Sequence, residues 1–143
     1  MKLDVPITIR YAETDMMGVV YHANYLLYFE DARTKFLEAI DYPYERVEEA
    51  GYISPVVNVA IDYRVPLRYG EHAIVRTYVS ELKATRTVFS YEVYCKGQNL
   101  ETEKPHATGQ TTLCLVQAGD FKPVSIKRVL PELYRKYQEV LEP

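Results

Sequence analysis

The chain has 143 residues, of which 48% are hydrophobic, so it can bury a sizeable core and is not a disordered tail. Its net charge of −3 comes without a block of basic residues, which argues against a nucleic-acid-binding protein. Since the sequence has neither the apolar segment of a signal peptide nor a run long enough to span a membrane, we expect a single domain, residues 1–143, of a cytoplasmic protein.

The first two predicted elements are a strand over residues 5–10 and a helix that begins at Asn24. The strand follows from the alternation in VPITIR. Asn24 is a suitable N-cap, Asp31 and Lys35 are spaced to form an ion pair, and Pro43 ends the helix because proline disfavours helical geometry in the preceding residue. One face of this helix is apolar and carries Tyr25, Phe29, Ala32, Phe36 and Ile40.

The remainder of the chain is mostly strand. Alternating patterns predict strands over residues 57–65, 73–80, 86–95 and 106–117, and residues 130–141 form a short C-terminal helix. One long helix beside about five antiparallel strands is an α+β pattern.

Some of these strands are apolar on both sides. Ile74 and Tyr78 point away from Val75 and Val79, because successive side chains of a strand alternate between the two faces of a sheet. A single helix covers only one face, so we expect a second subunit to cover the other face or the sheet edge.

The segment RYAETDMMGVVYHANYLLYFEDAR, residues 10–33, resembles a family signature. It is similar to the signature of hotdog-fold acyl-CoA thioesterases of the 4-hydroxybenzoyl-CoA thioesterase type, in particular the bacterial branch associated with the Tol-Pal system. The resemblance implies a hotdog fold, in which the antiparallel sheet wraps around the central helix, and subunits that pair through a continued sheet into dimers and then tetramers. The matching residues are Tyr11, Glu13, Thr14, Asp15, Gly18, Val20, His22, Asn24 and Tyr25.

The resemblance also implies a mechanism for acyl-CoA hydrolysis. Asp15 would act either as a nucleophile or as a general base on water, two roles that the sequence leaves open. Unpaired N–H groups at the start of the helix, notably that of His22, would polarise the thioester carbonyl. The alternative is that Asp15 only stabilises a turn in ETDMMG.

The other candidate site residues each have an ordinary structural alternative. The side chains of His22 and Tyr11 are candidate catalytic groups, although a histidine at a helix start and a packed tyrosine need no catalytic role. Gly18, Asn24 and Tyr25 are candidate substrate-binding residues; their alternatives are a turn glycine, an N-cap and a core residue.

The expected substrate is an acyl-CoA, so coenzyme A enters as part of the substrate and no cofactor or metal is implied. Local cations are needed to bind its phosphates in an acidic protein, and the candidates are Arg68, Lys83, Arg86, Lys127 and Arg128. The alternative for each is an ordinary surface charge. Cys95 and Cys114 lie in strands without a metal-binding spacing, and we expect both to be reduced.

Two other functions remain open from the sequence: a non-catalytic acyl-CoA-binding hotdog protein and an acyl-ACP thioesterase. A hotdog hydratase is disfavoured because its D-x-N-P-x-H signature is absent. The acyl group is undetermined; Tyr63, Phe89 and Tyr91 are equally compatible with an acyl pocket and with the core.

Overall fold

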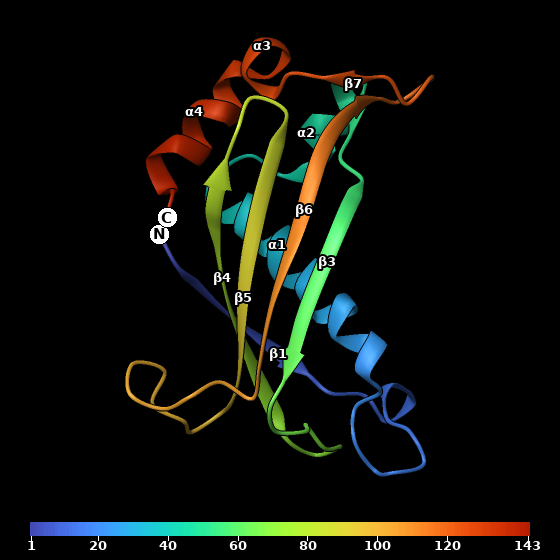
Figure 1. Cartoon of the computed structure of the whole chain (residues 1–143), viewed down its shortest axis with the longest axis vertical. Helices are drawn as coiled ribbons and strands as arrows, with labels where there is room; N and C mark the ends of the chain where they lie inside the picture. Colours follow the sequence, from blue (N-terminus) through green and yellow to red (C-terminus); the bar gives the residue numbers. More distant parts are fainter.

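The computed structural model describes all 143 residues as one long helix packed on an antiparallel sheet (Figure 1). The five long strands pair in the order β1-β4-β5-β6-β3. The α+β class, the central helix and the predicted strand number are therefore confirmed. The elements are α1 (Tyr25–Ala39), β1 (Leu3–Thr8), β3 (Val56–Tyr63), β4 (His72–Leu82), β5 (Arg86–Cys95) and β6 (Ala107–Gln117).

Several short elements were not predicted, because they are too short to show a period. Two-residue strands β2 (Tyr52–Ile53) and β7 (Pro123–Val124) both pair with the end of β6. The helix α2 (Tyr44–Glu49) follows α1, and the short helix α3 (Ile126–Val129) precedes α4 (Pro131–Val140), which confirms the C-terminal helix predicted over residues 130–141. The two chain ends lie side by side in Figure 1, where the terminal amine of Met1 donates to the Val140 carbonyl at 2.8 Å.

The core lies between the apolar face of α1 and the concave face of the sheet. All five residues of the predicted helical stripe are buried, and the Phe29 ring stacks on Tyr91 with centroids 4.1 Å apart. Gly109 of β6 makes this contact possible, since a Cβ there would lie 2.5 Å from a carbon of the Phe29 ring.

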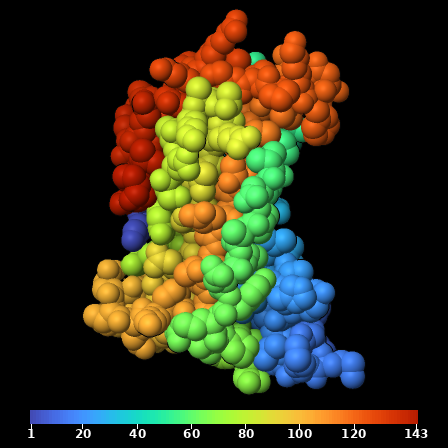
Figure 2. All heavy atoms as spheres, in the orientation of Figure 1, coloured from blue at the N-terminus to red at the C-terminus, as the bar shows by residue number.

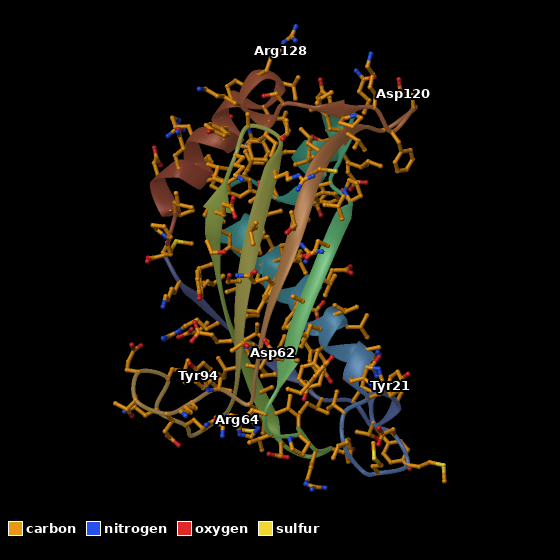
Figure 3. All side chains as sticks on the ribbon, viewed as in Figure 1. Tyr21, Asp62, Arg64, Tyr94, Asp120 and Arg128 are labelled. Atoms are coloured by element: carbon orange, nitrogen blue, oxygen red, sulfur yellow. The ribbon has the colours of Figure 1, made fainter.

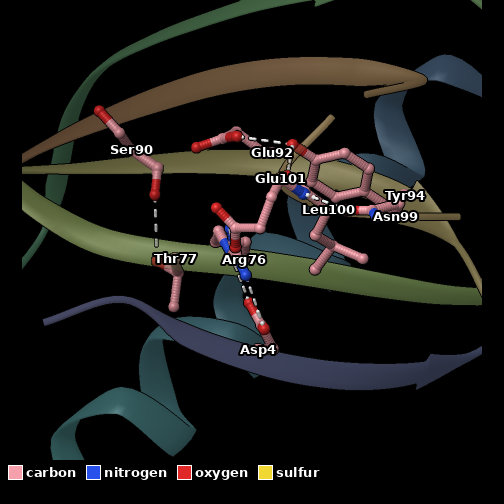
Figure 4. Close-up of polar contacts among 9 residues, drawn as sticks. All are labelled: Asp4, Arg76, Thr77, Ser90, Glu92, Tyr94, Asn99, Leu100 and Glu101. Atoms are coloured by element: carbon pink, nitrogen blue, oxygen red, sulfur yellow. Dashed lines mark hydrogen bonds and ion pairs between the residues drawn. The ribbon is translucent and has the colours of Figure 1, made fainter. Parts of the chain in front are cut away.

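The convex face of the sheet is more polar than expected. Arg76 forms ion pairs with Asp4 and Glu101 across three segments of the chain (Figure 4). The loop between β5 and β6 folds over Tyr94, whose hydroxyl donates to Glu92 at 2.7 Å. The chain itself thus supplies part of the cover that was expected from a second subunit.

The uncovered apolar surface lies at the edge of the sheet, on β3. Val56, Val57 and Val59 are 41%, 51% and 41% exposed, and β3 runs uncovered along the visible face of the molecule in Figure 2 (green). Because β3 pairs only with β6, its other edge has no partner in the chain.

Of two local predictions about α1, the N-cap is confirmed in position only and the ion pair is wrong. Asn24 occupies the N-cap position, but its side chain does not cap, because a 3₁₀ turn over His22–Asn24 runs directly into the helix. Lys35 pairs with Glu38 at 3.1 Å instead of Asp31.

No helix of the chain is both long and apolar enough to cross a bilayer.

Candidate active site

The segment between β1 and α1 is organised by one buried carboxylate, Glu13. Its side chain accepts hydrogen bonds from the amide and guanidinium of Arg10 and, at 2.9 Å, from the hydroxyl of Tyr28 on α1. Its carbonyl accepts from the amide of Tyr21 and from the side chain of Asn24. Glu13 therefore ties the loop to the helix on both sides of the candidate site.

The electrostatics of Glu13 follow from these bonds. Burial alone would raise the pKa of the carboxyl, but the hydrogen bonds from Arg10 and Tyr28 outweigh it and hold the pKa below its ordinary value. Glu13 is therefore a structural anion and is not suited to exchange protons with a substrate at neutral pH.

Asp15 lies at the beginning of a tight turn that projects from this loop. The turn is closed by bonds from the Asp15 amide to the Val19 carbonyl at 2.9 Å and from the Gly18 amide to the Asp15 carbonyl at 3.0 Å. Gly18 adopts φ +76°, a left-handed conformation that favours glycine. Oδ1 of Asp15 accepts from the Met17 amide at 2.8 Å, which leaves Oδ2 without a partner in the chain.

The start of the helical segment offers hydrogen-bond donors. In the turn His22–Asn24, the amide of Asn24 bonds to the Tyr21 carbonyl, whereas those of His22 and Ala23 have no acceptor in the chain. Free amides at a helix start carry a partial positive charge and can bind a developing oxyanion.

One pocket of about 220 Å³ joins the Asp15 turn to the helix start. Its lining includes Asp15, His22 and Tyr25, together with Tyr63 and Arg64 from the end of β3. The Tyr63 hydroxyl donates to the His22 carbonyl at 2.7 Å and so holds the helical turn against the strand. Figure 3 shows Tyr21 beside the start of α1 and Arg64 just beyond the end of β3.

The structure therefore brings together only part of the predicted set. Asp15, His22 and Tyr25 line the pocket, while Gly18 shapes the turn and Asn24 anchors the helix start to Glu13. Tyr25 is buried, which raises the pKa of its phenol to about 12 and keeps it protonated at neutral pH.

The remaining predicted residues lie outside this pocket. Tyr11 is 75% exposed and packs edge-on against Tyr69. Arg68 lies in the loop after β3, where its backbone forms an isolated antiparallel β-bridge with Val19 of the Asp15 turn. Lys83 pairs with Glu81 in the β4–β5 turn, near Arg86.

The β4–β5 turn lies far from the pocket within one chain. β3 ends at Tyr63, which pairs with Ala107 of β6, and Ala107 pairs in turn with Val93 of β5. Tyr63 and Val93 therefore lie at the same end of the sheet. Arg86 lies seven residues from Val93 along β5, or about 24 Å at the usual rise of a strand.

Sequence reasoning missed the contribution of the β3 end. Tyr63 was considered only as a possible pocket or core residue, and Arg64 was not considered. Arg64 is the cation that lines the pocket; its guanidinium donates to the carbonyls of Pro105 and Lys104. The alternation of β3 predicts where the strand ends, but only the pairing with β6 shows that this end meets the helix start.

A second potential nucleophile, Cys95, lies outside the pocket. Its thiol contacts Glu71 at 3.1 Å and the ring of His106 at 3.7 Å. Burial and the neighbouring Glu71 carboxylate raise the pKa of the thiol to about 12, so it stays protonated and unreactive. No cluster of three His, Cys, Asp or Glu side chains has the geometry of a metal site.

Comparisons with known proteins agree on one family. Residues 9–136 match the model of the thioesterase-like superfamily. The chain is 38% identical over 93% of its length to YneP of Bacillus subtilis (strain 168), named a putative acyl-CoA thioesterase, and 93% of that protein is covered. It is 32% identical to the acyl-CoA thioesterase YbgC of Haemophilus influenzae, over 86% of this chain and 87% of the relative.

Among solved structures, the DHNA-CoA thioesterase from Staphylococcus aureus superposes with a TM-score of 0.88 at 33% identity. The match covers 96% of this chain and 89% of that one. The predicted hotdog fold is confirmed by this agreement of sequence and structure.

Proposed function

The chain belongs to the thioesterase-like superfamily, and from this premise we propose that it hydrolyses acyl-CoA thioesters to the free acid and coenzyme A. The observation that carries the proposal is the pocket lined by both Asp15 and His22, in which a carboxylate oxygen and helix-start amides are left without partners. Thioester hydrolysis needs both an oxygen nucleophile and a group that stabilises the oxyanion.

In this proposal Asp15 is either the general base that activates water or the nucleophile itself. It either takes a proton from a water molecule that attacks the thioester carbonyl, or attacks the carbonyl itself to form an anhydride that water then opens. In both routes the C–S bond breaks, and the thiolate of coenzyme A leaves and takes up a proton. The amide of His22 stabilises the carbonyl oxygen. The bond from Tyr63 to the His22 carbonyl fixes the next peptide unit, which carries the free amide of Ala23.

The match of residues 10–33 to the 4-hydroxybenzoyl-CoA thioesterase type, and to its Tol-Pal-associated branch, supports the finer placement of this chain in that group. Two relatives named YbgC, of Haemophilus influenzae and Helicobacter pylori (strain 26695), are each 32% identical to it. Their names specify acyl-CoA, which favours this substrate over an acyl carrier protein.

We propose that the active unit is a dimer formed through β3 and that two dimers form a tetramer. The support is the row of exposed valines on an edge strand whose backbone has no partner on one side. An antiparallel pairing of β3 with its copy would place the Tyr63 end of one strand beside the Val56 end of the other. The candidate site would then lie at the interface.

The same pairing bears on the candidate cations. Arg64 and Arg68 lie near the pocket of their own chain and are proposed to contact the phosphates of coenzyme A. Lys83 and Arg86 lie at the opposite end of the sheet, so they would reach the substrate only from the second subunit.

The test of the mechanism is Asp15→Asn, which keeps the oxygen that accepts from Met17 and removes the charge. We expect thiol release from a panel of acyl-CoAs of different chain length to fall at least about 100-fold, with thermal stability unchanged. Asp120→Asn is the matched control, because Asp120 accepts from the amide two residues ahead in the same way, at 3.0 Å, but outside the pocket. This control should keep full activity.

Two outcomes would contradict the proposal. Equal turnover by Asp15→Asn would remove Asp15 from the mechanism. Absence of turnover by the unaltered protein on every thioester, together with tight acyl-CoA binding, would favour a binding protein instead of an enzyme.

A further inference from the structure

A second cavity lies farther along α1 than the Asp15 pocket. It has a volume of about 220 Å³ and lies between α1, α2, the helix-facing side of β5 and β6, and the C-terminal helices, and it is partly open to solvent beside Glu30. It shares no lining residue with the Asp15 pocket. The residues of α1 that line it are grouped around Arg33. Arg33 is eight residues, or about 12 Å, along the helix from Tyr25, which lines the Asp15 pocket.

The walls of this cavity are mainly apolar. Leu37 of α1, Phe89 and Leu113 of the sheet, and Leu133 of α4 contribute to them. An apolar cavity of about 150 Å³ is sufficient for benzene, so this one accommodates a molecule the size of a substituted single ring.

Apart from the exposed Glu30 and Thr34, three polar side chains in the lining have hydrogen-bonding capacity that the chain leaves unused. Thr87 is 3% exposed, and its hydroxyl is the one buried side-chain polar atom without a partner. Tyr137 is 6% exposed and its hydroxyl takes part in none of the hydrogen bonds of the chain. Leaving a buried hydroxyl unpaired costs stability, which points to a partner that the chain does not contain.

Arg33 is the third of these groups. Its Nη1 donates to the hydroxyls of Tyr91 at 3.0 Å and Thr111 at 3.5 Å, which leaves Nε and Nη2 free. The side chain is half-buried and belongs to none of the ion pairs of the chain. Its positive charge lies among apolar groups, and the only acidic residue in the lining is the exposed Glu30.

Arg33 can only donate, and the hydroxyls of Thr87 and Tyr137 can also donate, so a ligand with acceptor oxygens and a negative charge complements these three groups. We propose that this cavity binds a small, mainly apolar carboxylic acid, whose carboxylate accepts from Arg33 and whose apolar body fills the space beside Phe89. The site is separate from the Asp15 pocket, and its occupancy does not depend on thioester hydrolysis.

The test uses benzoate as the probe and its neutral analogue benzyl alcohol as the comparison, titrated into isotopically labelled protein and followed by amide NMR shifts. We expect benzoate to bind more tightly than benzyl alcohol and to shift amides at Arg33, Thr87, Phe89 and Tyr137. The Asp15→Asn variant should bind benzoate as the unaltered protein does, which keeps this result independent of the catalytic proposal.

Variants then assign the carboxylate contact. Arg33→Gln should weaken benzoate binding at least about tenfold and benzyl alcohol binding less than about twofold, because a charged hydrogen bond is lost only for the acid. Lys35→Gln, on an exposed position of the same helix, is the matched control and should change neither. Should Arg33→Gln fail to fold, Tyr137→Phe tests the same site and should weaken benzoate binding about threefold.

The proposal would be overturned by benzoate shifts confined to the Asp15 pocket or by the absence of benzoate binding. It would equally be overturned by benzyl alcohol binding as tightly as benzoate, or by the Arg33→Gln variant keeping full affinity for the acid.

Discussion

At the scale of the residue, the two acids of the motif have different tasks, and their surroundings decide which is which. Glu13 is buried and saturated with hydrogen bonds, whereas Asp15 is half-buried with one oxygen free. The same type of functional group therefore serves as an anchor at one position and, in our proposal, as a reactive group two residues later.

A first prediction concerns the anchoring role of Glu13. Glu13→Gln should lower the free energy of unfolding by about 1–3 kcal/mol at pH 7, because a buried, charge-assisted set of bonds to Arg10 and Tyr28 is weakened. The measurement is urea unfolding, with Glu38→Gln on the exposed face of α1 as the control.

The pH dependence of this effect follows from the lowered pKa of Glu13. A carboxyl whose folded-state pKa lies below its unfolded value, about 4.3, contributes its full stabilisation above that value and loses it as the pH falls through the folded pKa. The difference between the unaltered protein and Glu13→Gln should therefore be largest at pH 7 and shrink below about pH 4. A difference that grows on acidification would show that Glu13 does not stabilise the fold as an anion.

At the scale of the element, the position of α1 depends on a glycine in β6, because this residue has no side chain to keep the helix away from the sheet. Phe29 approaches the sheet where Gly109 leaves space, and its ring is thereby stacked on Tyr91. The helix start that lines the Asp15 pocket is one turn away from this contact, so packing in the middle of α1 positions the amides of the candidate site.

We therefore predict that Gly109→Ala is destabilising by about 1–3 kcal/mol, because the new methyl group would overlap the Phe29 ring and would also lie close, at 3.3 Å, to the carbonyl of Ala60. Gly119→Ala is the matched control: nothing lies within 4 Å of its Cβ position, and we expect a change of less than about 0.5 kcal/mol. Thermal or urea unfolding measures both. A Gly109→Ala variant as stable as the control would show that α1 can shift without cost.

At the scale of the whole molecule, the exposed edge of β3 is the feature that one chain leaves incomplete. The convex face of the sheet is covered in part by the chain itself, through the ion pairs of Arg76 and the loop over Tyr94. The valines of β3 have no such cover.

Val57→Lys and Val59→Lys should each shift the protein from the proposed dimer toward a monomer, since a lysine on an edge strand opposes pairing with a second strand. Light scattering at micromolar concentration measures the mass. Thr85→Lys in the exposed β4–β5 turn is the control and should leave the mass unchanged. A monomeric mass for the unaltered protein would refute the interface, and activity retained by a monomeric variant would show that the site is complete within one chain.

The sequence by itself determined the elements and the motif of this protein. The stripe from Tyr25 to Ile40 and the alternation of the long strands each reflect a local period of the backbone, so the helix and the sheet were predictable. Asp15, His22 and Tyr25 were predictable as one site because they are close in the chain.

Only the tertiary structure decided what lies next to that motif. Tyr63 and Arg64 reach the site because β3 pairs with β6 in one register, and Glu13 is an anchor because α1 places Tyr28 above it. The donors of Arg33, Thr87 and Tyr137 come from three elements that share no local pattern. Contacts between residues distant in sequence depend on packing and register, which arise from the whole chain and leave no periodic signal in any one segment.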